Sequence, residues 1–231
     1  MTKQLGLDLP SRAALEREAF FAAPCNHVAL AMIDRWPDWA GGKLVLSGPT
    51  GSGKTHLTHV WAAASGATIL QATALTETEV PTLAQGHVAV EDVPRIAGNA
   101  AAETALFHLH NLVLANGRNL LLTGTGPVAA WGLRLPDLVS RLEGTTAITI
   151  EEPDDVLLTV LLAKLLDDRQ LRTSANLIPY LLRRMDRSYA AAIALTQALD
   201  AASLAGKRPV TRALAADVFD ALDNTPPAGD N

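Results

Sequence analysis

The stretch GPTGSGKT, Gly48 to Thr55, combines residue types that bind phosphate groups. Its three glycines allow backbone conformations in which amide N–H groups point at phosphate oxygens. At this spacing, Lys54 is expected to reach the β- and γ-phosphates and Thr55 to ligate Mg²⁺. The alternative is a glycine-rich turn with this spacing by chance. The expected phosphate-loop residues are Gly48, Pro49, Thr50, Gly51, Ser52, Gly53, Lys54, Thr55 and, next on the helix, His56.

A second apolar run ends in VAVED, which places Glu91 and Asp92 at the end of an expected strand. Carboxylates at that place hold Mg²⁺ and polarise water in phosphate-loop sites, so the predicted metal ligands are Thr55, Glu91 and Asp92. The alternative is a solvated strand end. Glu91 stands where aspartate is usual, and Mg²⁺ requires tight octahedral geometry. We therefore expect slow hydrolysis by the chain itself.

Three further polar residues lie in places where chemistry is expected. Thr123 ends the apolar run LLLTG, Arg141 lies in LPDLVSRLEG, and Arg187 lies in RRMDRSYAAA. Taken singly, the threonine is a turn residue and each arginine is a solvated surface residue. Their order along the chain after the phosphate loop indicates a catalytic role instead.

Apolar strands that alternate with helices must position these residues. Four runs predict buried strands, namely 43–47, 67–70, 87–92 and the segment NLLLTG, and helices are expected between them. Continuous apolar strands separated by helices favour a parallel α/β sheet. From Asp154 onward the pattern predicts helices only, so we place a boundary near residue 152.

The same patterns give a domain division and some local expectations. Helix 26–36 is expected to bury Val28, Leu30, Met32 and Ile33, while Asp154 and Asp155 suit the first turn of the next domain's first helix. The predicted segments are a peptide 1–11, an α/β domain 12–152, a helical domain 153–225 and a Pro- and Gly-rich tail 226–231 that is expected to be disordered.

Composition narrows the classes of function. The net charge of −5 argues against a broad basic surface for nucleic acid, and four Trp, two Tyr and four Phe provide little for base stacking. The single cysteine, Cys25, cannot form an internal disulfide, which fits a reducing cytoplasm. No apolar stretch of about 18 residues occurs, so no membrane span is expected. The expected location is cytoplasmic.

The N-terminal stretch QLGLDLP allows two interpretations. Leu5, Leu7 and Leu9 alternate as in an edge strand, or they form an extended peptide that binds a groove on another protein. Pro10 separates the stretch from the rest of the fold, and an edge strand does not require a glutamine at position 4. Pro10 and Gln4 therefore favour the interpretation as an extended peptide that binds another protein.

The motifs together resemble those of the AAA+ ATPases, and among these the DnaA-related family of replication proteins. The resemblance is carried by GPTGSGKTHLTHVW, LPDLVSRL and MDRSYAAAIALTQAL and covers about 20–222. It implies an AAA+ P-loop fold with a parallel α/β sheet and a C-terminal all-helical lid. It further implies that ADP or ATP binds with Mg²⁺.

The resemblance also implies a role for each motif residue. Glu91 and Asp92 would be the Walker B pair, Thr123 sensor 1 and Arg187 sensor 2. Arg141 would be an arginine finger that acts in trans on a neighbouring subunit's ATP. The segment FFAAPCN matches the family's adenine contacts, which gives Phe21, Pro24 and Asn26 as further nucleotide-binding residues.

The resemblance finally implies partners. QLGLDLP is similar to peptides that bind the β sliding clamp, with Gln4, Leu5, Leu7 and Leu9 as the contacts. The chain resembles the short regulatory members of the family, which inactivate the initiator DnaA. The sequence ends where the initiator continues into a helix-turn-helix domain, so no sequence-specific DNA binding is expected. A dimer or larger oligomer would gain avidity for a ring-shaped clamp.

Other functions remain as alternatives. A DnaA-like or helicase-loader-like ATPase acting directly on nucleic acid would need a local basic or aromatic patch. A metabolic P-loop kinase would leave Arg187, the helical C-terminal part and the leucine triplet unexplained, and the third alternative is a degenerate nucleotide-binding scaffold. His56 and His59 lie three residues apart, but no further ligand cluster accompanies them, so packing or surface roles are expected.

Overall fold

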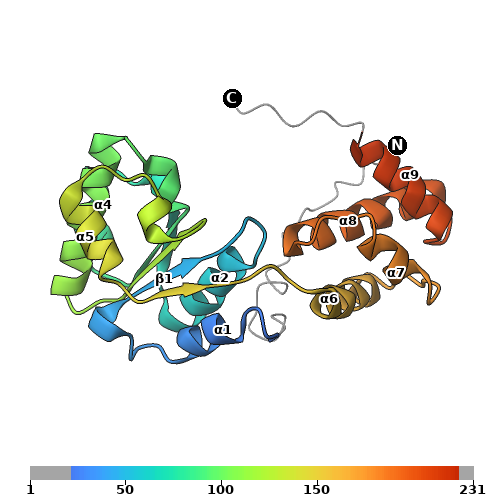
Figure 1. Cartoon of the computed structure of the whole chain (residues 1–231), viewed down its shortest axis with the longest axis horizontal. Coiled ribbons are helices and arrows are strands. Elements are labelled where there is room, and N and C mark those ends of the chain that lie inside the picture. Colours follow the sequence, from blue (N-terminus) through green and yellow to red (C-terminus); the bar gives the residue numbers. More distant parts are fainter. Residues whose placement is uncertain (1–21, 224–231) are drawn as a thin grey trace, which may run out of the picture. The chain divides into compact units, whose positions relative to one another are not determined.

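A computed structural model describes residues 22–223 of the chain. The contacts divide it into two units, which Figure 1 shows coloured along the sequence. The first holds the described residues up to Pro49 together with Lys54–Ile150, and the second holds Thr50–Gly53 and the described residues from Glu151 onward. None of the helices in the described part of the chain is long and apolar enough to cross a membrane.

The first unit is built on a five-stranded parallel sheet with the strand order β2-β3-β4-β1-β5. The predicted parallel α/β fold is therefore confirmed. Its strands are β1 (Lys43–Ser47), β2 (Thr68–Gln71), β3 (Val88–Glu91), β4 (Leu120–Gly124) and β5 (Ala147–Thr149), and its α-helices are α1 (His27–Asp34), α2 (Lys54–Ser65), α3 (Val80–Leu83), α4 (Ala100–Ala115) and α5 (Pro136–Glu143). Short 3₁₀ turns include η5 (Glu77–Glu79) and η6 (Val93–Ile96).

Helices cover both faces of this sheet, which explains why its central strands are apolar without alternation. On one face Val45 and Leu122 pack with residues of α4 and α5, and on the other Leu44 and Leu121 pack with residues of α1 and α2 (Figure 1). All residues of β3 and β4 are buried. The central strands are thereby enclosed on both faces.

Two burial predictions were wrong, both for residues at the margin of the fold. The strand predicted at 67–70 forms the edge strand β2, and its residues are half-buried or exposed. In α1 the buried residues are Ala29, Leu30 and Ile33, whereas Val28 is 47% exposed. The apolar composition of a segment does not show how many strands and helices will pack against it in the fold. The run AIT also forms a fifth strand that the sequence interpretation did not include.

The second unit contains α6 (Asp155–Asp168), α7 (Leu177–Leu182), α8 (Tyr189–Gly206) and α9 (Arg212–Asp223) around its own leucine-rich core. Asp154 caps α6, because its carboxylate accepts a hydrogen bond from the N–H of Leu157 at 2.8 Å. Ser188 caps α8 in the same way through the N–H of Ala191. The helical C-terminal part is therefore confirmed.

Candidate functional site

The parallel sheet brings the ends of three strands together. Ser47 at the end of β1 pairs with Gly124 at the end of β4, and Val90 of β3 pairs with Leu122 of β4. Because the strands are parallel, the residues that follow them meet at one edge of the sheet. This places the phosphate loop, Glu91 and Thr123 side by side at the carboxyl ends of the strands.

Lys54 is the most constrained residue of this edge. It begins α2, is buried, and donates hydrogen bonds from Nζ to the carbonyl oxygens of Gly48 and Pro49, both at 2.8 Å. Burial lowers the pKa of Lys54, while the carboxylates of Asp92 and Glu91 act in the opposite direction. The ammonium group and the two carboxylates therefore share one site.

Glu91 has one satisfied and one unsatisfied oxygen. Its side chain is buried, and Oε2 accepts a hydrogen bond of 3.1 Å from the amide of Gln71 at the end of β2. Oε1 is buried without a hydrogen-bond partner. A buried carboxylate oxygen without a partner is costly unless a cation or donor binds there.

Asp92 and Thr123 hold each other in place across β3 and β4. Asp92 adopts a left-handed backbone conformation with φ 56°, which turns the chain at the end of β3. Its backbone N–H donates to the hydroxyl of Thr123 at 3.2 Å, and Thr123 is buried. The threonine predicted as sensor 1 thus fixes the turn that carries the carboxylates.

The loop residues Thr50–Gly53 group with the second unit. The carbonyl of Gly51 accepts a hydrogen bond of 2.9 Å from the N–H of Tyr189. Gly51 has φ +73°, and a Cβ atom there would lie 2.9 Å from Cβ of Ser188, so this position requires glycine. The hydroxyl of Ser52 is buried without a partner.

Arg187 lies in the second unit, one residue before the cap of α8. Its guanidinium group forms an ion pair of 3.1 Å with Asp155, and both side chains are more than half exposed. An exposed ion pair of this kind contributes little to the stability of the fold, so another anion can readily replace Asp155 as the partner of Arg187.

Arg141 lies at the opposite end of β1 from the phosphate loop. Its carbonyl accepts hydrogen bonds from Nζ of Lys43, the first residue of β1, at 3.1 Å and from the hydroxyl of Thr145 at 2.8 Å. The loop follows the last residue of β1, and a strand rises about 3.3 Å per residue, so roughly 13 Å of strand separates these two places. The Arg141 side chain is exposed, and its Cζ atom lies 5.9 Å from the ring centroid of Phe107.

The remaining predicted residues lie in the turn before α1, in α2 or outside the described residues. Asn26 is buried and its side-chain oxygen accepts from the N–H of Ala23 at 2.8 Å, which closes that turn, while Pro24 is exposed. His56 is half-buried on α2 after the exposed Thr55. Outside residues 22–223 lie Phe21 and the predicted clamp contacts Gln4, Leu5, Leu7 and Leu9.

The donor set at the strand ends fits a nucleotide with Mg²⁺. An ammonium group, an exposed threonine hydroxyl, the unsatisfied Glu91 Oε1 and the carboxylate of Asp92 are the groups that such a ligand uses. Within the part that the structure describes, no cluster of three or more His, Cys, Asp or Glu residues is present. Mg²⁺ usually binds through one or two carboxylates together with substrate phosphates.

Sequence reasoning missed three contributing residues. Gln71 orients Glu91, and Lys43 together with Glu103 fixes the two ends of α5. Gln71 had a detectable signal, because a polar residue that ends the strand next to VAVED lies beside Glu91 in any parallel arrangement. Glu103 and Lys43 carry no such signal, since a carboxylate in the first turn of a helix and a lysine at the start of a strand are ordinary surface features.

Comparison with solved structures identifies the class of fold as that of the AAA+ ATPase domains. Domain III of the Thermotoga maritima initiator DnaA superposes with a TM-score of 0.76 at 16% identity, covering 92% of this chain and 98% of that domain. No protein-family model matches the chain.

Three further structures give the same result. AMPPCP-bound DnaA from Aquifex aeolicus superposes with a TM-score of 0.69 at 20% identity, over 84% of this chain and 67% of that one. The Thermotoga maritima RuvB branch-migration motor gives 0.64 at 16% identity, over 80% of this chain and 63% of that one. Another DnaA, bound to AMPPCP and single-stranded DNA, matches over 65% of its length at 18% identity. At these identities the likeness establishes the fold.

Proposed function

We propose that the chain is a nucleotide-binding AAA+ regulator of chromosomal replication initiation, of the type represented by Hda. In this proposal it binds the β sliding clamp through QLGLDLP and stimulates ATP hydrolysis by the initiator DnaA. The initiator is left with ADP, which prevents re-initiation. The fold it shares with DnaA domain III and the residues at the strand ends support the nucleotide-binding part.

The position of Arg141 is the observation that supports the proposed mechanism. Its backbone is anchored at the far end of β1 from the chain's own phosphate loop, and its side chain is exposed. Among residues 22–223, none of the ion pairs involves Arg141. An exposed guanidinium on an anchored backbone, on a surface away from the chain's own phosphate loop, suits the phosphates of another subunit.

An arginine supplied in trans neutralises charge that develops on the transferred phosphoryl group. Such fingers contribute on the order of 10³- to 10⁵-fold in rate in other phosphate-loop enzymes. The planar guanidinium can contact two phosphate oxygens at once, which a lysine cannot do. The chain's own nucleotide, which we propose to be ADP, would be held by Lys54, Thr55 and the loop amides, with Mg²⁺ near Glu91 and Asp92.

The experiment that tests this function measures ATP hydrolysis by purified DnaA with DNA-loaded clamp, with and without the protein, and with ADP supplied. The proposal expects a several-fold or greater increase in rate that requires the clamp. Changing Gln4, Leu5 and Leu7 to alanine is expected to abolish clamp binding and leave ADP binding intact. A rate that is unchanged by the protein, with clamp and ADP present, would show that the chain is not this regulator.

The alternative, direct action on nucleic acid, has one supporting observation. A solved DnaA with the same fold is bound to single-stranded DNA. The net charge of −5 argues against it, because binding to phosphate backbones depends mainly on basic side chains. A gel-shift titration with single-stranded DNA at low and high salt distinguishes the two functions.

A further inference from the structure

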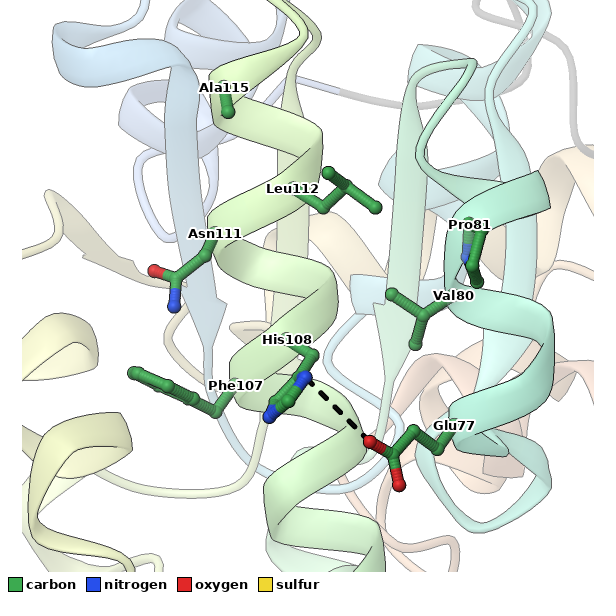
Figure 2. A pocket seen from close by; sticks show the side chains of 8 residues that line it. All are labelled: Glu77, Val80, Pro81, Phe107, His108, Asn111, Leu112 and Ala115. Atoms are coloured by element: carbon green, nitrogen blue, oxygen red, sulfur yellow. Dashed lines mark ion pairs between the residues drawn. The ribbon is translucent and has the colours of Figure 1, made fainter.

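A surface groove runs between α3 with its preceding turn η5 and the outer side of α4. Its volume is about 470 Å³, and the aliphatic side chains of Val80, Pro81, Leu112 and Ala115 form much of its wall (Figure 2). Pro81 and Ala115 are exposed, while Leu112 is half-buried. A concave apolar surface of this kind commonly marks a place where a partner binds.

The ionisable groups of the groove lie at its margin. At one end Oε1 of Glu77 lies 3.8 Å from Nδ1 of His108, and Figure 2 shows these two side chains pointing toward each other from η5 and α4. Their side chains are 66% and 49% exposed, so the pair is weak and readily opened. Asn111 also lines the groove, but its side chain points away from Val80 and Pro81, so the wall lacks the several convergent polar groups that small-molecule sites usually contain. Its chemistry suits a protein side chain instead.

The groove continues to the surface that carries Arg141. Phe107 lines the groove and also lies beneath the Arg141 guanidinium, with 5.9 Å between Cζ and the ring centroid. A partner that contacts Arg141 therefore also covers Phe107. From there the apolar wall of the groove is the next surface that the partner reaches.

We infer that this groove receives an aliphatic side chain, flanked by a basic residue, from the same partner subunit whose nucleotide Arg141 reaches. The aliphatic chain packs between Pro81 and Leu112, and the basic group pairs with the exposed carboxylate of Glu77. This inference rests on the proposed function, since Arg141 is the feature that brings the partner to this face. The groove then contributes affinity and Arg141 contributes rate.

Two variants distinguish the contribution of the groove from that of Arg141. Ala115→Arg fills the wall with a bulky cation that repels the expected basic residue, and its positive charge suits the last turn of α4, so folding is preserved. Glu77→Lys reverses the charge at the margin. Ala101→Glu is the control, an exposed alanine in the first turn of the same helix that does not line the groove.

The measurement is initiator ATP hydrolysis with DNA-loaded clamp, titrated with initiator to saturation. Ala115→Arg and Glu77→Lys are expected to raise the half-saturating initiator concentration about tenfold or more while the maximal rate stays within twofold of wild type, as for loss of uniform binding. Ala101→Glu is expected to behave as wild type. If wild type stimulates and both groove variants have wild-type half-saturation, the groove inference is wrong and the proposed function stands. If wild type does not stimulate, the proposed function fails, and the inference with it.

Discussion

At the scale of single residues, Lys54 shows how the site is arranged for an anion. This lysine is buried, and its Nζ donates hydrogen bonds to two carbonyl oxygens. Burial lowers its pKa, and the charges of Asp92 and Glu91 act in the opposite direction. A phosphate bound there would gain a charged donor that is already oriented.

Replacing Lys54 by alanine is expected to weaken ADP binding by about 100-fold or more, because the charged donor to the phosphates is lost. The free energy of unfolding without nucleotide is expected to change little or rise, since a buried charge is removed together with its desolvation cost. Titration with a fluorescent ADP analogue and urea unfolding measure the two quantities. Lys164→Ala, an exposed lysine of α6 paired with Asp168, is the control. Undiminished ADP affinity of Lys54→Ala would contradict the assignment of the phosphate site.

At the scale of elements, α5 is fixed at both ends by polar side chains, of which Glu103 is buried and Lys43 half-buried. At its start, Glu103 of α4 accepts hydrogen bonds from the N–H groups of Gly98, Arg134 and Leu135 at 2.8, 2.8 and 2.6 Å. Toward its end, Lys43 binds the carbonyl of Arg141 and contacts Nε2 of His110 at 3.3 Å. The helix that presents Arg141 is therefore held by specific contacts.

Glu103→Gln is expected to lower the free energy of unfolding at pH 7 by about 2 kcal/mol, because an amide NH₂ would face backbone donors and charged hydrogen bonds would be lost. Burial alone would raise the pKa of Glu103, but the backbone N–H groups and the Arg134 charge outweigh it and hold the pKa below its ordinary value. Its contribution is therefore present above pH 4.5 and lost as pH falls through the lowered pKa. Urea unfolding at pH 7 and at pH 3 tests this, and an equal loss at both values would contradict it.

His110 predicts a second dependence of stability on pH. Burial, and to a lesser extent the charges of Lys43 and Arg141, lowers its pKa from 6.5 to about 4, although the Asn111 side chain acts in the opposite direction. The unfolded chain therefore binds a proton between pH 6.5 and 4 that the folded chain does not bind. Stability is expected to fall by about 3 kcal/mol as pH decreases through this window. In His110→Gln that slope is expected to be shallower by the same amount, measured by urea unfolding at pH 7 and 4.5, and an unchanged slope would refute the buried neutral histidine.

Particular elements show what could be predicted from sequence. The strands that end just before Gly48 and at Glu91 were predicted correctly, because a strand end followed by glycines or carboxylates is a local pattern. The exposure of β2 and Val28 depends on which elements become neighbours, and local pattern does not contain that information. For the same reason the contacts of Glu103, spanning 31 and 32 residues to Arg134 and Leu135, could not be foreseen.

At the scale of the whole molecule, the two units have separate cores, and the phosphate loop contains residues of both. Lys54 begins a helix of the first unit, whereas Gly51 bonds to the backbone of Tyr189 in the second. The loop that joins β1 to α2 therefore belongs in part to each unit.

The measurement that tests the central claim most directly is the rate of ATP hydrolysis by DnaA with DNA-loaded clamp and ADP, in the presence of Arg141→Ala. We predict that this variant binds ADP and clamp as wild type does and leaves the initiator at its basal rate. Arg118→Ala, which removes an exposed arginine outside the site, is predicted to stimulate as wild type. Stimulation by Arg141→Ala equal to that of wild type would contradict the account.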